Sequence, residues 1–397
     1  MNDLGFLEKL LDGAEVEWRP LGGVVDVRRG KRLVKNQLQE TGPFAVFQNS
    51  MTPLGYYDES NVAAGSAFII CAGAAGSIGY SEEEFWAADD VYFFIPPEGI
   101  NSRFIYHWLL SQQGWISSQV RKGVVPRLPK PAVQKLSLPI PCPENPEKSL
   151  AIQGEIVRIL DSFTELTSEL ASELELRKKQ YNHYRDQLLG YDVDGLQLIP
   201  LGWIGEVRMC KRVLKSQTSP AGDIPFFKIG TFGGRPDAFI PRDLFAKFKE
   251  KYRYPMIGEV LISASGTLGR AVIFDGKEAY FQDSNIVWLE NSENKVLNKY
   301  LFYFYQIAKW RSSDGGVIKR LYNDNIKRTL IPVPCPEDPE RSLAEQARIV
   351  AILDKFEKLT TSLSEGLPRE ITLRQKQYEY YRDQLLSFAK PAEPTEP

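Results

Sequence analysis

One long segment occurs twice in the chain, and this duplication limits the folds available to it. The first copy covers residues 138–189 and the second covers residues 331–386. Each copy starts with a proline-rich stretch, PIPCPENPE or PVPCPEDPE, and each ends almost identically, in LRKKQYNHYRDQLL or LRQKQYEYYRDQLL. A match of this length does not arise by chance, so the sequence contains an internal repeat.

Each copy predicts a long amphipathic helix. In the first copy, apolar residues recur at steps of three and four from Ile156 to Leu188. The preceding prolines predict helix starts near Ser149 and Ser342, which are suitable N-caps. A helix over residues 151–189 would be about 58 Å long and would need a partner to cover its apolar stripe. The second copy is the obvious partner. The residues expected to pack between the two helices are Ile156, Phe163, Leu170, Tyr181, Ile349, Phe356, Leu363 and Tyr378.

The two copies differ at one place. Leu174 and Tyr181 are seven residues apart, whereas the matching Leu367 and Tyr378 are eleven residues apart. The four extra residues correspond to about one helical turn. The sequence Gly366-Leu367-Pro368 at this point predicts a break or kink in the second helix.

The duplication also includes a module before each helix. With a constant offset of 180, Pro20-Leu21-Gly22 matches Pro200-Leu201-Gly202. Each module then predicts an apolar strand, a glycine turn, an aromatic strand and a helix, and in the first module this strand covers residues 91–95 and this helix residues 103–110. We therefore predict an α+β fold with two mixed α/β modules, separated by a long antiparallel two-helix coiled coil in a pseudo-twofold repeat. The predicted boundaries are 1–145 and 191–338 for the modules, 146–190 and 339–388 for the helices, and 389–397 for a disordered tail.

Charge is distributed unevenly along the chain. Residues 196–335 hold 21 Lys and Arg against 13 Asp and Glu, whereas residues 1–150 hold 14 against 17. The second module is therefore basic, as expected for a protein that binds a polyanion. No apolar run is long enough to cross a membrane, and four scattered cysteines argue against a zinc site and for the cytoplasm.

Clusters of cations recur at matching positions in the two modules. They fit either a solvated strand edge that blocks aggregation or a set of phosphate contacts, and their recurrence favours the second interpretation. Polar loop residues such as Gln48, Asn49, Lys228 and Arg235 are candidates for reading bases. The candidate DNA-binding residues are Arg28, Arg29, Lys31, Arg32, Lys35, Arg127, Arg208, Lys211, Arg212, Lys215, Lys228, Arg235, Lys247, Lys249, Lys319 and Arg320.

The sequence offers little for catalysis. Its two histidines, His107 and His183, lie within predicted helices, and no phosphate-binding GxxxxGK[ST] loop occurs. A nuclease pattern could join Pro236-Asp237 to Glu293-Asn294-Lys295, but this separation is large. We therefore predict no catalytic residue, no metal site and no bound cofactor.

The segments PIPCPENPEKSLAIQ, IVRILD and LRKKQYNHYRDQLL, with their second copies, resemble the specificity subunit of type I restriction–modification systems. This resemblance implies two target-recognition domains, each reading one half of a split sequence in double-stranded DNA. It also implies that the helices set the spacing and dock two modification subunits. Adenine methylation with S-adenosylmethionine, and cleavage with Mg²⁺ and ATP, would then belong to the modification and restriction subunits.

Two other functions remain open at this point. The chain could be a stand-alone DNA methyltransferase or nuclease that hides its motifs, in which case the purified chain would methylate or cut DNA alone. It could instead be a coiled-coil scaffold that binds protein and not DNA. Binding to duplex DNA that is absent or insensitive to salt would favour the scaffold.

Overall fold

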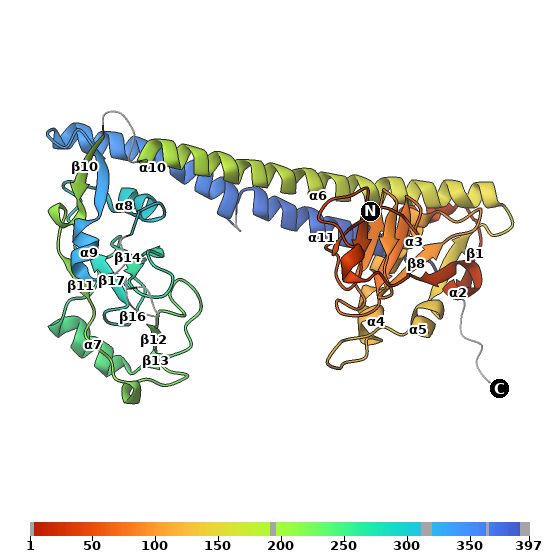
Figure 1. The fold of residues 1–397 in the computed structure, drawn as a ribbon, viewed down its shortest axis with the longest axis horizontal. Coiled ribbons are helices and arrows are strands. Elements are labelled where there is room, and N and C mark those ends of the chain that lie inside the picture. The colour runs from red at the N-terminus through yellow and green to blue at the C-terminus, as the bar shows by residue number, and fades with distance from the viewer. Residues whose placement is uncertain (1–3, 191–195, 311–319, 363–364, 390–397) are drawn as a thin grey trace. The chain divides into compact units, whose positions relative to one another are not determined.

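Two compact units make up the computed structural model, which describes residues 4–190, 196–310, 320–362 and 365–389 (Figure 1). Unit 1 contains Met1–Ala171 and Glu370–Pro397, and unit 2 contains Ser172–Arg369. Each unit therefore combines one module with parts of both helical segments of the repeat.

The module of unit 1 (module 1) contains three sheets. The largest has the antiparallel order β2-β8-β5-β6, the second has the order β4-β3-β7, and the third pairs β1 with β9. The elements are α1 (Leu4–Leu11), β1 (Val16–Pro20), α2 (Leu21–Val24), β2 (Asp26–Arg29), η1 (Lys35–Gln37), β3 (Phe44–Phe47), β4 (Gly55–Tyr57), β5 (Ser66–Ile70), β6 (Ile78–Ser81), β7 (Phe85–Ala87), β8 (Val91–Ile95), α3 (Ser102–Ser111), α4 (Gln113–Ser118), α5 (Lys130–Gln134) and β9 (Ser137–Pro141).

The module of unit 2 (module 2) repeats this topology. Its sheets have the orders β11-β17-β14-β15, β13-β12-β16 and β10-β18, which match module 1 strand for strand. Helix α7 is an addition between β13 and β14. The elements are β10 (Leu196–Pro200), η2 (Leu201–Trp203), β11 (Val207–Met209), η3 (Lys215–Gln217), β12 (Ile224–Phe227), β13 (Phe239–Ile240), α7 (Arg242–Lys251), β14 (Val260–Ser263), β15 (Ala271–Ile273), β16 (Tyr280–Phe281), β17 (Ile286–Leu289), α8 (Asn298–Tyr305), α9 (Asn323–Arg328) and β18 (Leu330–Pro334).

The central strands are buried on both faces, which explains their continuous apolar sequences. On β5, Ala67 and Ile69 join the core beneath α3, whereas Phe68 and Ile70 face the cluster that contains Phe85 of the smaller sheet. Alternate residues of a strand point to opposite faces, so one run of five buried residues fills two cores. Each module is therefore a layered α/β structure, and the predicted mixed fold is confirmed.

The prediction that Ser149 and Ser342 are the N-caps is wrong. Helix α6 (Pro146–Leu189) and helix α10 (Pro339–Thr361) begin three residues earlier, at prolines. Proline suits the first turn of a helix because the N–H it lacks would have no intrahelical partner there. The capping side chains are Asn145, which accepts from Lys148 N, and Asp338, which accepts from Arg341 N.

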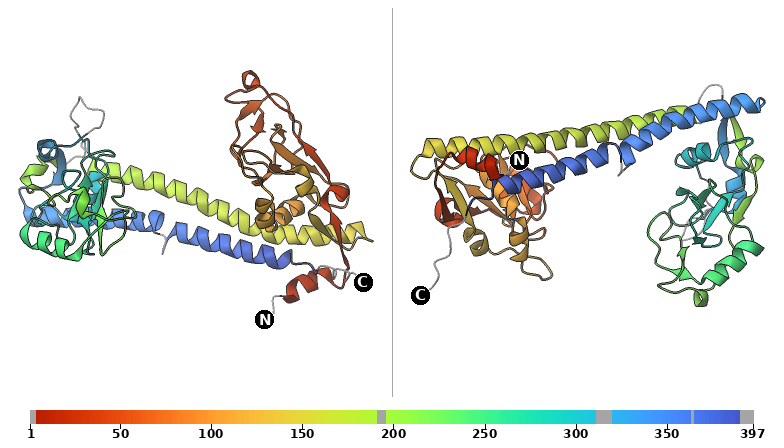
Figure 2. Two further views of the ribbon diagram at one scale, coloured as in Figure 1. Left: turned by 90° about the horizontal axis from the view of Figure 1, so that it is seen from below. Right: turned by 180° about the vertical axis from the view of Figure 1, so that it is seen from behind.

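The long helices pack antiparallel within each unit. In unit 1, the Phe163 ring on α6 stacks on Tyr381 of α11 (Leu367–Leu385), and Ile159 lines one cavity with Leu385. In unit 2, Tyr184 of α6 stacks on Phe356 of α10. Helix α6 itself is continuous over 44 residues (Figure 2).

The predicted break in the second helical segment is confirmed. Helix α10 ends at Thr361, α11 starts at Leu367, and Gly366 between them has a φ of +87°. A Cβ at residue 366 would lie 2.6 Å from the Lys358 carbonyl oxygen, so this turn requires glycine. Leu363, one of the residues expected in the helix packing, lies outside the described residues.

The other residues expected in the helix packing have different environments. Ile156 and Ile349 are buried in the cores beneath the two modules. Tyr378 is 4% exposed, whereas Leu170 and Tyr181 are half-buried. One part of each helix's apolar stripe therefore packs against a module, and another part packs against the other long helix.

Candidate nucleic-acid interface

The loop after the first strand of the large sheet carries matched cations in both modules. It leads from β2 through Lys31 and Arg32 to η1 in module 1, and from β11 through Lys211 and Arg212 to η3 in module 2. The two short helices have the same local geometry. The Gln37 side chain accepts a hydrogen bond from Val34 N at 3.2 Å, and the matching Gln217 accepts one from Leu214 N at 2.9 Å. The sequence repeat is therefore also a structural repeat in this loop.

The cations of module 1 differ in whether a carboxylate neutralises them. Arg28 forms an ion pair with Asp26 at 2.7 Å, and Arg29 donates to the Asp89 carbonyl. Lys31, Arg32 and Lys35 are exposed, and no carboxylate among the described residues lies within 4.0 Å of their charged groups. These three cations are therefore available to an external anion.

Most of the matching cations of module 2 have partners. Arg208 pairs with Glu290 at 2.9 Å, and Arg212 pairs with Asp283 at 2.8 Å. The Lys211 ammonium lies 5.1 Å from the centre of the Tyr252 ring. Lys215, the first residue of η3, is exposed.

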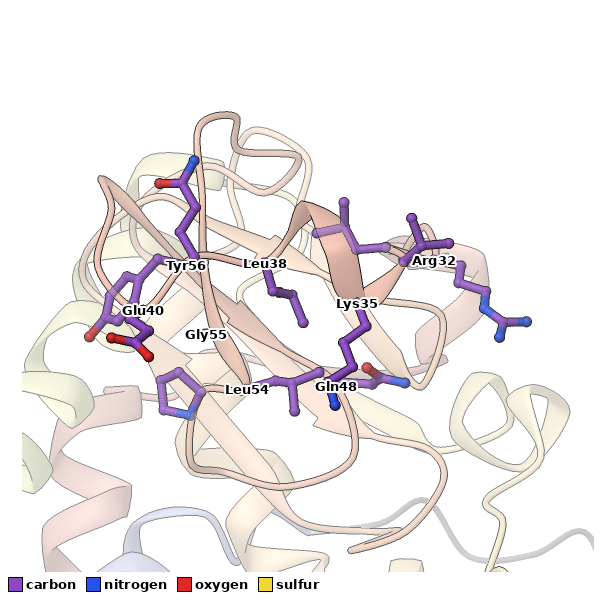
Figure 3. A pocket seen from close by; sticks show the side chains of 12 residues that line it. Arg32, Lys35, Leu38, Glu40, Gln48, Leu54, Gly55 and Tyr56 are labelled. Atoms are coloured by element: carbon purple, nitrogen blue, oxygen red, sulfur yellow. The ribbon is translucent and has the colours of Figure 1, made fainter.

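An open cavity of about 720 Å³ lies beside the loop of module 1 (Figure 3). Lys35 and Gln48 point toward the same part of it, whereas Arg32 points outward. Leu54 and Tyr56 line the cavity as well, so it combines cationic, amide and apolar groups. This mixture of groups suits a ligand that has both phosphates and bases.

Another matched pair of cations, Arg127 in module 1 and Arg320 in module 2, lies next to the glycine turns. Arg127 exchanges two backbone hydrogen bonds with Arg121, at 2.8 and 3.1 Å, and forms a bridge to Ala72. Its counterpart Arg320 forms a bridge to Ser265, and its guanidinium donates to Asn285 Oδ1 at 3.1 Å. The neighbouring Lys319 lies outside the described residues.

Further cations of module 2 lie on loop 228–237 and on α7. Lys228 pairs with Asp237 at 2.8 Å, and Arg235 is exposed. Lys247 and Lys249 are exposed on α7, where the Lys249 ammonium lies 5.2 Å from the Tyr254 ring centre. Helix α7 has no counterpart in module 1, so these cations belong to module 2 alone.

His107 is part of a buried network and not of a reaction centre. Its Nε2 lies 2.7 Å from Asp161 of α6, and its Nδ1 lies 2.9 Å from the Tyr378 hydroxyl of α11. Burial lowers the pKa of His107, although Asp161 opposes this shift. Burial alone would raise the pKa of Asp161, but hydrogen bonds from His107 and Arg103 hold it below its usual value. The neutral ring therefore donates from Nε2 to the carboxylate and accepts the Tyr378 O–H at Nδ1.

Unit 2 repeats this network with a different central residue. Tyr303 takes the place of His107, and its hydroxyl oxygen lies within hydrogen-bond distance of Asp354 and, at 2.8 Å, of Glu357, so its one proton is shared between the two carboxylates. Lys299 takes the place of Arg103 and pairs with Asp354 at 3.1 Å. The repeated role of this position is therefore to attach the module to a long helix.

The sequence analysis missed two buried glutamines that also attach the modules to the helices. Gln153 accepts from Asn101 N at 2.8 Å and donates to Gly99 O at 3.0 Å. Gln346 makes the corresponding pair of bonds, to Leu297 N and Lys295 O. The sequence pattern that could have predicted them is a serine followed four residues later by a glutamine in both copies, at Ser149 and Gln153 and at Ser342 and Gln346. In each pair the serine hydroxyl accepts a hydrogen bond from the glutamine amide.

The described residues hold no group of three or more His, Cys, Asp or Glu side chains that could bind a metal ion. Burial raises the pKa of the Cys210 thiol to about 12, so this cysteine stays protonated at neutral pH. Within the described part of the chain, no helix is long and apolar enough to span a membrane.

Comparison with known proteins identifies the class of protein. A family model described as the type I restriction modification DNA specificity domain matches residues 14–176 and, a second time, residues 194–373. The chain is therefore a DNA-recognition protein with two specificity domains. A putative type I restriction enzyme specificity subunit of Haemophilus influenzae is 47% identical to it, over 98% of this chain and all of the relative.

A type I restriction enzyme specificity subunit of Escherichia coli is 34% identical, over 98% of this chain and 99% of the relative. A crystal structure of the type I restriction–modification S subunit from M. genitalium has a similar fold. It has a TM-score of 0.58 at 16% identity, and the match covers 96% of this chain and 98% of that one. The chain belongs to the specificity subunits of type I restriction–modification systems, and its role is DNA recognition without catalysis.

Proposed function

We propose that each module reads one half of a split target in double-stranded DNA, and that the loops 28–35 and 208–215 hold the DNA backbone. The observation that carries this proposal is the matched geometry of the two loops, with exposed Lys35 and Lys215 both starting a short helix after a sheet strand. Cations on a rigid loop position a protein on DNA through phosphates.

The pairing pattern divides the candidate residues into two groups. Lys31, Arg32 and Lys35 carry uncompensated charge and act as direct phosphate contacts in the proposal. Arg28 and Arg208 pair with acidic neighbours, so they contribute mainly to the structure of the strand and less to binding. The basic residues of module 2, including Lys247 and Lys249 on α7, extend its contact to the backbone.

The long helices dock the modification subunits in this proposal, and their length sets the gap between the two half-sites. Leu176 on α6 and its repeat counterpart Leu373 on α11 are 60% and 46% exposed. In the proposal, each of these two leucines contributes apolar surface to the contact with a modification subunit. We propose residues 1–145 and 191–338 as recognition domains and residues 146–190 and 339–388 as docking helices.

The partners follow from the family. A solved structure that concerns complex assembly and conformational transition of the type I R-M system has a similar fold, with a TM-score of 0.56 at 15% identity over 94% of this chain and 97% of that one. In the proposal, two modification subunits supply S-adenosylmethionine-dependent adenine methylation, and restriction subunits supply Mg²⁺- and ATP-dependent cleavage. The complex works in the cytoplasm, on the DNA of the cell.

Co-expression of this chain with its modification subunit tests the proposal. Mapping methylated adenines across the host genome should reveal one new split motif. Replacing residues 16–135 with the module of another family member should change one half of the motif and leave the other. A host without a new methylated motif would refute the proposal.

The two alternative functions predict other results. Methyl transfer or DNA cutting by the purified chain alone would indicate an enzyme. DNA binding by the assembled complex that does not respond to salt would indicate a scaffold. The repeated family match and the named relatives favour the specificity role over both.

A further inference from the structure

The residue that follows the central strand of the small sheet occupies the same place in both modules. This residue is Gln48 after β3 and Lys228 after β12, and the two are again 180 positions apart. The backbone just before each is held in the same way. The Phe47 carbonyl accepts from Ala88 N at 2.9 Å, and the Phe227 carbonyl accepts from Gln282 N at 2.9 Å. Gln48 and Lys228 are therefore structural equivalents.

Some positions hold the same residue in both modules, and others hold different residues. Three cations of the loop are identical in the two modules, with Lys31 and Lys211, Arg32 and Arg212, and Lys35 and Lys215 as pairs. Residues shared by two modules that read different half-sites suit the part of DNA that all sequences share, which is the phosphate backbone. Gln48 and Lys228 are polar and differ in type, and Gln48 lines one cavity with Arg32 and Lys35 of that loop. A difference at such a position suits contact with bases.

The Gln48 side-chain amide is positioned to form hydrogen bonds with a ligand in the cavity. The side chain is half-buried in the wall of the 720 Å³ cavity, and Lys35 points toward the same space (Figure 3). Among the described residues, the Gln48 amide has no hydrogen-bond partner. The carbonyl of the next residue, Asn49, accepts from Ala74 N at 2.9 Å, which fixes the backbone that carries the amide. A glutamine amide can bind adenine N6 and N7 together in the major groove.

Lys228 presents different chemistry at the equivalent place. Asp237 lies 2.8 and 3.0 Å from its ammonium through its two carboxylate oxygens. An ammonium has three N–H donors, so at least one remains for a ligand after the carboxylate is satisfied. The carboxylate also restricts where the ammonium can lie. Lysine pairs with guanine O6 or N7 in the major groove.

We propose that Gln48 and Lys228 are specificity-determining residues, with Gln48 reading an adenine in one half-site and Lys228 reading a guanine in the other. This inference rests on the proposed function, because it assumes that the cavity of module 1 and the equivalent surface of module 2 face DNA. The carboxylate of Asp237 keeps the lysine in the guanine-reading position.

Methylation mapping of variants tests the assignment. The full chain, co-expressed with its modification subunit, should be compared with the variants Gln48→Ala, Gln48→Glu and Lys228→Ala. Gln48→Ala should relax a single A·T position in one half-site and leave the other half-site unchanged. Lys228→Ala should relax a single G·C position in the opposite half. Gln48→Glu should favour cytosine at the position that Gln48 reads, since a carboxylate can only accept, as from cytosine N4.

Binding measurements on the purified complexes complete the test. By fluorescence anisotropy, the wild type should prefer the matched duplex over one changed at the Gln48 position by about 10- to 100-fold, and Gln48→Ala should lose this preference. Gln119→Ala is the matched control, because within the described part of the chain the Gln119 amide donates only to the neighbouring Ser118 hydroxyl. It should leave the motif unchanged.

The outcomes separate this inference from the proposed function. If the wild-type complex methylates no motif, the proposed function fails and the inference fails with it. If the wild type methylates a split motif and Gln48→Ala methylates the same motif, only the inference is overturned. Equal weakening of all duplexes by Gln48→Ala would also overturn it, since that result indicates a phosphate contact.

Discussion

The uncompensated cations of module 1 predict a measurable salt dependence. The variant Lys31→Ala/Arg32→Ala/Lys35→Ala removes three charges that have no carboxylate partner among the described residues. Each phosphate contact contributes about −0.9 to the slope of log K against log salt, so three contacts contribute about −2.7. Raising salt fourfold should then weaken the wild type about 40-fold more than the variant. Fluorescence anisotropy of the assembled complex on its target duplex, over a salt titration, measures both slopes.

A matched variant tests whether the effect is specific to this loop. Lys135→Ala/Lys148→Ala/Arg158→Ala removes the same charge from α6 and from the residue that follows α5, and its slope should stay near that of the wild type. If the loop variant kept the wild-type slope, the three cations would not contact phosphates and the proposed orientation of module 1 would be refuted. Equal changes in both variants would show a general charge effect instead, and would refute it too.

Three further predictions concern stability. Gln153→Ala and Gln346→Ala should each destabilise their own unit by about 1–4 kcal/mol, measured by urea unfolding, because each leaves a part-buried N–H and a part-buried carbonyl without a side-chain partner. A loss below about 1 kcal/mol would contradict this. Burial lowers the pKa of His107, so unit 1 should lose stability as pH falls below about 6.5, and His107→Gln should flatten that dependence in thermal melts at pH 5 to 7.5. Gly73→Ala should lower the free energy of unfolding by about 1–2 kcal/mol because residue 73 has a φ of +83°, and by more because the new Cβ would lie 2.7 Å from Asn49 O. A variant that unfolds at the same urea concentration as the wild type would show that residue 73 does not require glycine.

The pH prediction has an internal reference in unit 2. Tyr303 occupies the position of His107, and burial with two acidic neighbours raises its pKa, so it stays neutral over the same range. The folded unit 1 binds the His107 proton more weakly than the unfolded chain does, which is why stability falls toward acid and not toward base. A variant that kept the full pH dependence without His107 would show that another group causes it.

Patterns local to the sequence predicted much of the fold. The aromatic strand was predicted at residues 91–95, where β8 lies, and the helix at 103–110 lies within α3. The break at Gly366 was also predicted. These features depend on residue periodicity, on glycine and on proline, which act over a few neighbouring residues and can be read without knowing distant contacts.

The candidate site was only partly predictable. The matched cations were visible as a repeat, but their pairing was not, because Arg208 and Glu290 are 82 residues apart in sequence and meet only through β11 and β17. Gln48 and Lys228 were candidates for reading bases, whereas the structural equivalence of the two residues and the place of Gln48 beside Arg32 and Lys35 required the fold.

The sequence alone determined that two similar modules are each followed by a long helical segment, because a duplication can be detected by comparing two parts of the same sequence. Only the tertiary structure decided the strand order, and which helix segments accompany which module. Tyr378, from the second helical segment, lies against His107 of the first module, and Tyr181, from the first segment, bonds to Gln306 of the second. Burial of apolar surface and satisfaction of buried polar groups select such partners, and both depend on residues far apart in the chain.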